Sequence, residues 1–288
     1  MKTVKRSSVV YDMSPANHPV AEAAQGEAIR FLTEDAYSGV LCAVNDRYPA
    51  SMQGRANPAT GPVSIAGARV GDVLAIRIVS IKPVGMGTMY TGPTRGPLGY
   101  KLSEDAVAKL AIRKGCVRVD GRDIPLRPMV GVIGVAPAVP IDTTWPGEHG
   151  GNLDCNVITA GATVYLPVAV DGALLAIGDV HAVQADGEVA ICAVETRGEV
   201  VVNASIYRSP IITPAVETRS SLYLLASAET LDATETSVLD KTYRYLTEIS
   251  GMGSHEAVRF MSLACDLQVC QVVDPAKTMR MKLPKKYL

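Results

Sequence analysis

Gly71-Asp72-Val73-Leu74-Ala75-Ile76-Arg77-Ile78 begins with a glycine and an acid and continues as a run of β-branched and apolar residues. Glycine supplies the positive φ of a tight turn, and the run that follows favours a half-buried strand. Related glycine-led runs lie at residues 26–31, 161–166, 187–192 and 198–202. We therefore expect a mainly β protein, whose body is a sandwich or barrel, because long helical patterns do not alternate with the strands.

Helical patterns are few. Ser103 as an N-cap and Gly115 as a terminator predict one helix between them. After Pro214, apolar residues at helical spacing predict a helix over 234–249, Ser254 predicts the cap of a second helix, and 267–273 has the pattern of a buried strand. We divide the chain into a β-rich body, residues 1–210, and a smaller α+β C-terminal lobe, residues 211–288.

The composition is that of an ordinary globular protein. Apolar residues make up 48% of the 288 residues, charged residues 20%, and the formal net charge is −1. This balance gives no electrostatic reason to expect nucleic acid or a membrane as a partner. No run reaches the ~18 apolar residues of a membrane helix, no signal peptide is recognisable at the start, and the six cysteines form no CxxC pair. These features favour a reducing, cytoplasmic location.

The four histidines differ in their sequence surroundings. His18 lies in a proline-containing loop and His255 in the first turn of a predicted helix, so both are expected at the surface. His149 and His181 have several carboxylates close by in the sequence. These two histidines mark the candidate chemistry.

The first candidate segment is Glu148-His149-Gly150-Gly151-Asn152-Leu153-Asp154. Two glycines after a histidine allow a sharp turn and close approach of the backbone to a ligand. Asn152 and Asp154 fall on the same side of an extended chain. An ordinary polar loop explains the segment equally well.

The second candidate segment is Asp179-Val180-His181-Ala182-Val183-Gln184-Ala185-Asp186-Gly187-Glu188. In a strand, Asp179 and His181 point to one face, and a turn at 184–187 would return Glu188 to His181 across a hairpin. Imidazole and carboxylate are the ligands of zinc and related divalent ions. The alternative is a solvated hairpin with a satisfied histidine.

Nucleophilic mechanisms have less support. The chain has no Gly-x-Ser-x-Gly elbow. Cys155 follows Asp154 and is conceivable as a nucleophile, but neighbouring carboxylates are expected to raise the pKa of its thiol. We therefore favour activated water over a thiolate.

The two segments, in this order, resemble the acetamidase/formamidase family. The resemblance rests on 149–154, on Tyr165-Leu166-Pro167-Val168 and on Gly178-Asp179-x-His181-Ala182-x-Gln184-x-Asp186-Gly187-Glu188. Flanking segments over 57–62, 71–74, 131–137 and 265–275 are also similar, so the resemblance is collinear over about residues 25–285. Cys155, Ala185 and Ser38 depart from the family pattern.

The resemblance implies hydrolysis of small carboxamides such as formamide or acetamide to the acid and ammonia, with cyclic amides for related members. It also implies a β-rich fold that assembles into a homo-oligomer. Asp35 resembles a family acid near the N-terminus. The partner expected is a small amide substrate.

These observations combine into one hypothesis about the site. The residues predicted to bind a divalent metal, zinc first with calcium or manganese as alternatives, are Asp35, Asp154, Asp179 and His181. The predicted catalytic residues are Glu188 as general base, His149 for the oxyanion, and Asp186 as a further acid. Gly150, Gly151 and Asn152 are predicted to bind substrate. The rival hypothesis is a non-catalytic β-sandwich that holds a structural metal or small ligand.

Overall fold

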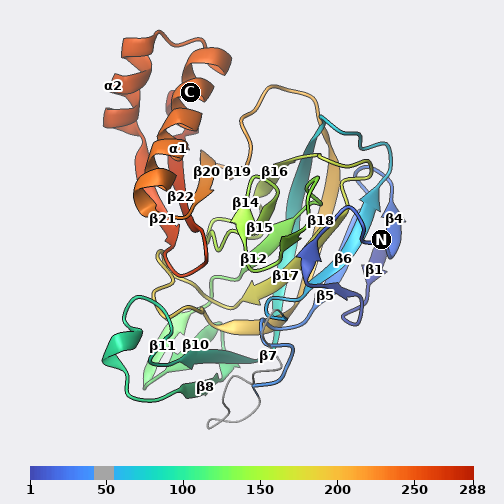
Figure 1. Cartoon of the computed structure of the whole chain (residues 1–288), viewed down its shortest axis with the longest axis vertical. Coiled ribbons are helices and arrows are strands. Elements are labelled where there is room, and N and C mark those ends of the chain that lie inside the picture. Colours follow the sequence, from blue (N-terminus) through green and yellow to red (C-terminus); the bar gives the residue numbers. More distant parts are fainter. Residues whose placement is uncertain (42–54) are drawn as a thin grey trace.

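One large, curled sheet makes up most of the protein (Figure 1). The computed structural model describes residues 1–41 and 55–288, and Cys42 falls outside them. Over these residues, 17 strands belong to the large sheet, nearly all paired antiparallel. They are β1 (Lys2–Val4), β2 (Val9–Val10), β4 (Ala21–Ala23), β5 (Ala28–Thr33), β6 (Ala59–Ile65), β7 (Val73–Thr91), β8 (Ala106–Leu110), β12 (Met129–Gly134), β14 (Pro146–Gly147), β15 (Gly150–Asn152), β16 (Thr163–Pro167), β17 (Leu175–His181), β18 (Glu195–Tyr207), β19 (Ala215–Glu217), β20 (Ser221–Ala228), β21 (Asp266–Gln271) and β22 (Lys277–Pro284).

Two small sheets and a few helices complete the fold. The small sheets join β9 (Ile112–Arg113), β10 (Cys116–Val119) and β11 (Arg122–Pro125), and separately β3 (Asp12–Met13) and β13 (Ile141–Asp142). The helices are α1 (Leu231–Arg244), α2 (Ser254–Ala264), a π-helical turn over Tyr245–Ile249 and short 3₁₀ turns over Gly99–Lys101 and Lys285–Tyr287. In the described part of the chain, no helix is long and apolar enough to cross a membrane.

The mainly β fold predicted from the glycine-led runs is confirmed. Four of the runs form strands, β5, β7, β16 and β18, and their inward side chains join the main core around Phe31, Ile76 and Val200. The run at 187–192 is different, because it forms turns and exposes Val189. The prediction of a strand there is wrong: its residues have strand propensity, but β17 pairs instead with the start of β18.

The helix predicted over 103–115 is also wrong. Residues 106–110 form β8, which pairs with the far half of the long strand β7. Val107 and Leu110 are the buried residues of β8, and their spacing of three also fits a helix. Pairing with β7 decides between the two structures, and no local signal reports that pairing.

The C-terminal portion contains the helices expected there. The helix predicted over 234–249 is confirmed as α1 and its π-helical end. The strand predicted over 267–273 is confirmed as β21, but only its last two residues, Cys270 and Gln271, are buried. The second helix is capped one residue earlier than expected, where Gly253 N–H donates to the Glu256 carboxylate (3.3 Å). Helices α1 and α2 lie together at one end of the molecule in Figure 1, beside β20, β21 and β22. Their apolar faces share a second hydrophobic core with these three strands.

The order of strands brings the candidate segments together. Strand β12 lies between β15 and β17, and every residue of β17 is buried. At the end of β17, His181 lies opposite Glu195, the first residue of β18. The loop between β21 and β22 joins this region through a bridge of Gln271 to Gly187. Three distant parts of the chain thus meet around His181.

Candidate functional site

His181 is the centre of a buried group of acidic side chains. Its Nε2 lies 3.0 Å from Glu195 Oε2 and 3.3 Å from Asp179 Oδ1. Its Nδ1 lies 2.8 Å from Gln184 Oε1 and 3.8 Å from Asp154 Oδ1. The imidazole thus has carboxylates on both sides, and all of these side chains are buried.

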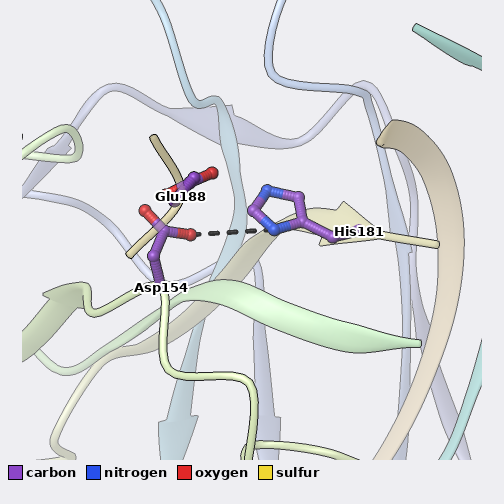
Figure 2. Close-up of side chains that lie close together, drawn as sticks. All are labelled: Asp154, His181 and Glu188. Atoms are coloured by element: carbon purple, nitrogen blue, oxygen red, sulfur yellow. Dashed lines mark ion pairs between the residues drawn. The ribbon is translucent and has the colours of Figure 1, made fainter. Parts of the chain in front are cut away.

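A second acidic group lies on the Nδ1 side of the ring. Figure 2 shows Asp154 and Glu188 close together, with the Asp154 carboxylate directed at His181. Asp274, from the loop between β21 and β22, interacts electrostatically with Asp154 and Glu188. Two sets of three ligand atoms are close enough to hold one metal ion, Asp154–His181–Glu188 and Asp179–His181–Glu195.

Several polar atoms of these groups are buried without a hydrogen-bond partner among the described residues. They are Asn152 Oδ1, Asp154 Oδ1, Asp179 Oδ1, His181 Nε2, Glu188 Oε2, Glu195 Oε2 and Asp274 Oδ2. Buried polar atoms in folded proteins are normally paired. Such a concentration in one place points to a ligand or ion.

The backbone at the site is strained. Asp154, Asp179 and Glu188 have φ values of 41°, 53° and 45°, a region that residues with a Cβ rarely adopt. Strain of this kind persists where the surrounding fold fixes it, often at functional sites. Here it directs three carboxylates toward one volume.

A small cavity of about 210 Å³ opens beside the acidic groups. Its wall combines the five carboxylates of both groups with the cationic side chain of Arg95 and with neutral polar and apolar side chains. The lining residues are Ala36, Tyr37, Ala56, Asn57, Tyr90, Arg95, Thr144, Asn152, Asp154, Asp179, Glu188, Ile191, Cys192, Glu195, Val273, Asp274 and Pro275. Pockets for drug-sized ligands occupy about 300–1,000 Å³, so this cavity suits a smaller molecule.

The carboxyl groups of the site differ in pKa. Burial, reinforced by neighbouring carboxylates, raises the pKa of Asp154 to about 6 and the pKa of Glu195 to about 8. The same causes raise the pKa values of Glu188 and Asp274 well above their usual range. Burial acts against ionisation of Asp179 as well, but His181 holds the pKa of Asp179 low. Near neutral pH the site therefore contains both protonated and ionised carboxyl groups.

The structure places the predicted residues in two sets. Asp154, Asp179, Glu188 and Asn152 line the cavity, and His181 lies among them. The others lie outside the cavity lining: Asp35, Asp186, His149, Gly150 and Gly151. Asp35 accepts hydrogen bonds from the backbone of Tyr37 and Gly39 (2.9 Å each). Asp186 pairs with Arg280 through both carboxylate oxygens (2.9 and 2.8 Å).

Sequence reasoning missed Glu195, Gln184 and Asp274. Glu195 begins a strand, and only its pairing opposite His181 shows its importance. Asp274 lies 120 residues beyond Asp154, and nothing local connects the two. Gln184 appears in the family pattern at 178–188, and that pattern was the one available signal for it.

The thiol of Cys155 differs from the sequence expectation. Burial would raise its pKa, but the Cys270 thiol and the Arg280 guanidinium lower it to about 7. Arg280 Nη1 lies 3.7 Å from each sulfur. The prediction that carboxylates raise this pKa is wrong, because the side chain faces the Arg280 side and not the cavity. His18 and His255 are exposed, as predicted.

Comparisons with known proteins identify the family of the chain. The model of the acetamidase/formamidase family matches residues 140–263. An acetamidase from Bacillus halodurans is 38% identical, with 99% of this chain and 98% of that chain covered at a TM-score of 0.95. A predicted acetamidase/formamidase from Thermoanaerobacter tengcongensis is 33% identical, with 100% and 96% covered at a TM-score of 0.94.

Matches to the curated relatives are shorter. The acetamidase of Mycolicibacterium smegmatis is 34% identical over 148 residues, 46% of this chain and 36% of that protein. The aligned stretches cover 17% to 36% of the curated relatives that match. The full-length match to the Bacillus halodurans acetamidase carries the assignment: this chain belongs to the acetamidase/formamidase family.

Proposed function

We propose that the protein hydrolyses small carboxamides, such as formamide or acetamide, to the carboxylic acid and ammonia. The observation that carries this proposal is the group of five carboxylates, four of them buried close to His181, which line one small cavity. Relatives named acetamidase and formamidase support the reaction class. Cyclic amides are a secondary substrate class within the same proposal.

A divalent metal fits the donor set. The carboxylate oxygens and the imidazole nitrogen are of the kind that zinc and related ions prefer, and the atoms of each set lie within 4.8 Å of one another. The unpartnered Asp179 Oδ1, His181 Nε2 and Glu195 Oε2 would hold it. A metal bound there would lower the pKa of a bound water and polarise the amide carbonyl.

The second acidic group supplies the proton transfers. Hydrolysis of an amide requires a base for the attacking water and an acid for the departing nitrogen. Asp154, with a pKa of about 6, is mostly ionised at pH 7 and can accept the proton of the water. Burial and the neighbouring Asp154 raise the pKa of Glu188 well above its usual range, which favours the protonated form that would donate to the leaving amine. Proton transfer between these neighbouring groups would restore the starting state.

Neutral side chains would orient the amide. Asn152 and Asn57 line the cavity, and Asn57 Nδ2 is 3.4 Å from Asp179 Oδ2. Their amides could bind the carbonyl and the NH₂ group of a carboxamide. A cavity of about 210 Å³ leaves room for only a short acyl group. Binding energy from such a substrate is small, so catalysis must depend on accurate positioning.

Ammonia release from formamide and acetamide tests the proposal directly. We expect turnover by metal-replete protein, loss on treatment with a chelator, and recovery when a divalent ion is returned. Glu188→Gln should lower kcat by about 10²–10⁴-fold. Glu199→Gln, a surface carboxyl paired with Arg30 and Lys82, is the matched control.

The same assay separates the proposal from its rival. No turnover of any small amide by metal-replete protein would overturn hydrolysis and favour a non-catalytic metal-binding protein. A lactam is tested separately, by the appearance of the amino acid from ring opening. Homo-oligomerisation remains part of the proposal, since the family resemblance implies it, and light scattering after gel filtration measures it.

A further inference from the structure

Gln184 contacts both the His181 ring and the backbone of Asp154. Its side chain is buried between the imidazole and the backbone of Asp154, with 3% of its surface exposed. The amide makes two short contacts: Oε1 lies 2.8 Å from His181 Nδ1, and Nε2 donates to Asp154 O at 2.7 Å. The His181 ring and the Asp154 backbone therefore cannot move independently of each other.

The chemistry of the partners fixes the orientation of this amide. A backbone carbonyl only accepts hydrogen bonds, so the NH₂ group of Gln184 must face Asp154 O. The amide oxygen therefore faces His181, and His181 Nδ1 must carry a proton to donate to it. The reversed amide would set two acceptors, Gln184 Oε1 and Asp154 O, against each other.

Burial opposes protonation of His181, but Glu195 and Asp179 raise its pKa and favour a proton on Nε2 in the metal-free protein. When a metal displaces that proton, the proton retained on Nδ1 leaves the lone pair of the ring on Nε2. That nitrogen lies 3.3 Å from Asp179 Oδ1 and 3.0 Å from Glu195 Oε2. Zinc binds such atoms at about 2.0–2.2 Å, which puts the ligands of a tetrahedral ion about 3.4 Å apart. The three atoms are buried, and each carboxylate oxygen lies near this separation from Nε2. A cation bound between the three atoms would complete this ligand set.

The other set of ligand atoms is at a disadvantage. Only Nδ1 of His181 faces Asp154, at 3.8 Å, and that nitrogen already donates to Gln184. An ion held by Asp154, His181 and Glu188 would have to displace this proton and break the contact with Gln184.

We infer that Gln184 is a positioning residue that commits His181 Nε2 to a metal held with Asp179 and Glu195, and leaves Asp154 and Glu188 outside the ligand set. The inference rests on the proposed function for the presence of a metal. It divides the site into a metal-binding side and a proton-transferring side. Outer partners of metal-binding histidines fix their tautomer in this way in other metal sites.

Zinc affinity, measured by competition with a chromogenic chelator, tests the division. Glu195→Gln should weaken zinc binding by more than about 100-fold, whereas Glu188→Gln should change it by less than about 5-fold. Equal losses, or a greater loss for Glu188→Gln, would overturn the assignment. Circular dichroism of each metal-free variant shows whether it is folded.

Variants of Gln184 test the positioning role. Gln184→Met removes both contacts and should weaken zinc binding by about 10–100-fold. Gln184→Glu keeps an acceptor for Nδ1–H but lacks the donor to Asp154 O, so it should recover only part of the affinity that Gln184→Met loses. In ¹⁵N NMR spectra of the zinc-bound wild type, the His181 Nδ1 proton should be observed and Nε2 should carry the metal shift.

These outcomes are distinct from failure of the proposed function. Unchanged zinc affinity in folded Gln184→Met, or metal on Nδ1, would overturn the role of Gln184 even if amides are hydrolysed. Absence of zinc, manganese and calcium binding by wild-type protein would overturn the inference and the metal-dependent mechanism together. Normal metal binding without amide turnover would overturn only the proposed function.

Discussion

Gly131 occupies the narrow space between two carboxylates of the site. A Cβ placed on it would lie 2.5 Å from Asp154 Oδ1 and 2.5 Å from Asp179 Oδ2. Both carboxylates have strained backbones and little freedom to yield. Gly131→Ala should therefore displace them and lower kcat/KM for acetamide by about 100-fold, since misplacement of about 1 Å costs that much.

A glycine with open surroundings provides the control for this substitution. A Cβ on Gly253 would meet no atom within 4 Å, so Gly253→Ala should leave kcat/KM unchanged. Wild-type kcat/KM in folded Gly131→Ala would contradict the prediction. It would mean that the distance between the two carboxylates is not critical.

His149 provides a prediction about stability against pH. Burial lowers the pKa of His149 from 6.5 to about 4. As the pH falls through 6.5, the unfolded chain therefore takes up a proton that the folded chain refuses until about pH 4, and the free energy of unfolding falls. At 1.36 kcal/mol per pKa unit, the loss reaches about 3 kcal/mol at pH 4.

Urea unfolding at pH 7 and pH 5 measures this effect. His149→Phe keeps a ring but cannot titrate, so its free energy of unfolding should change by about 2 kcal/mol less between the two pH values than that of the wild type. Equal changes in both proteins would show that His149 is accessible to protons in the folded state.

At the scale of elements, the loop between β21 and β22 brings Asp274 into the cavity. Gln271 holds this loop: its Oε1 accepts from the backbone of Val273 and Asp274 (2.9 and 3.0 Å). Its Nε2 donates to Ala276 O (2.7 Å) and Thr278 Oγ1 (3.1 Å). The side chain is fully buried, so water does not replace these bonds.

Gln271→Ala should release the loop. Buried groups left without partners cost about 1–3 kcal/mol, so we expect the free energy of unfolding to fall by about 2 kcal/mol, and kcat/KM to fall at least 10-fold as Asp274 leaves its place. Urea titration and ammonia release measure the two effects. Gln25→Ala, an exposed glutamine that also bonds to backbone, should change neither.

Elements were predictable where local and long-range forces agree. The runs that became β5, β7, β16 and β18 have strand propensity, glycine turns and an apolar face that the core requires. The segment at 103–115 has a helix cap and helical spacing, yet pairing with β7 makes it a strand. The free-energy difference due to intrinsic propensity is small compared with the stabilisation that a strand gains by pairing with a long neighbouring strand.

At the scale of the whole molecule, the difference between local signals and long-range contacts limits prediction of the site. Asp179 and His181 share a strand face, so the two-residue alternation of side chains in a strand was enough to place them together. Glu195 and Asp274 join them only through sheet register and through a loop from the other end of the chain. No spacing in the sequence encodes those contacts, and the resemblance at 265–275 assigned Asp274 no role.

The whole molecule should gain stability from metal binding. A ligand that binds only the folded state stabilises it by RT ln(1 + [L]/Kd), about 4 kcal/mol at 1,000 times Kd. With an unfolding entropy of about 2.1 cal/mol/K per residue, this raises the Tm of a chain of 288 residues by about 7 °C. Differential scanning calorimetry with and without zinc measures the shift.

The size of the shift should depend on pH. In the metal-free protein burial raises the pKa of Glu195 to about 8, so at pH 6 an ion must displace the proton on this carboxyl before it can bind there. We therefore expect a larger rise in Tm at pH 8 than at pH 6. Glu195→Gln should reduce the rise to about 2 °C or less at both pH values, and Glu199→Gln should retain it in full. A rise that persists in full in Glu195→Gln would place the stabilising ion elsewhere, because a neutral amide cannot replace the charge that makes this buried carboxylate a ligand.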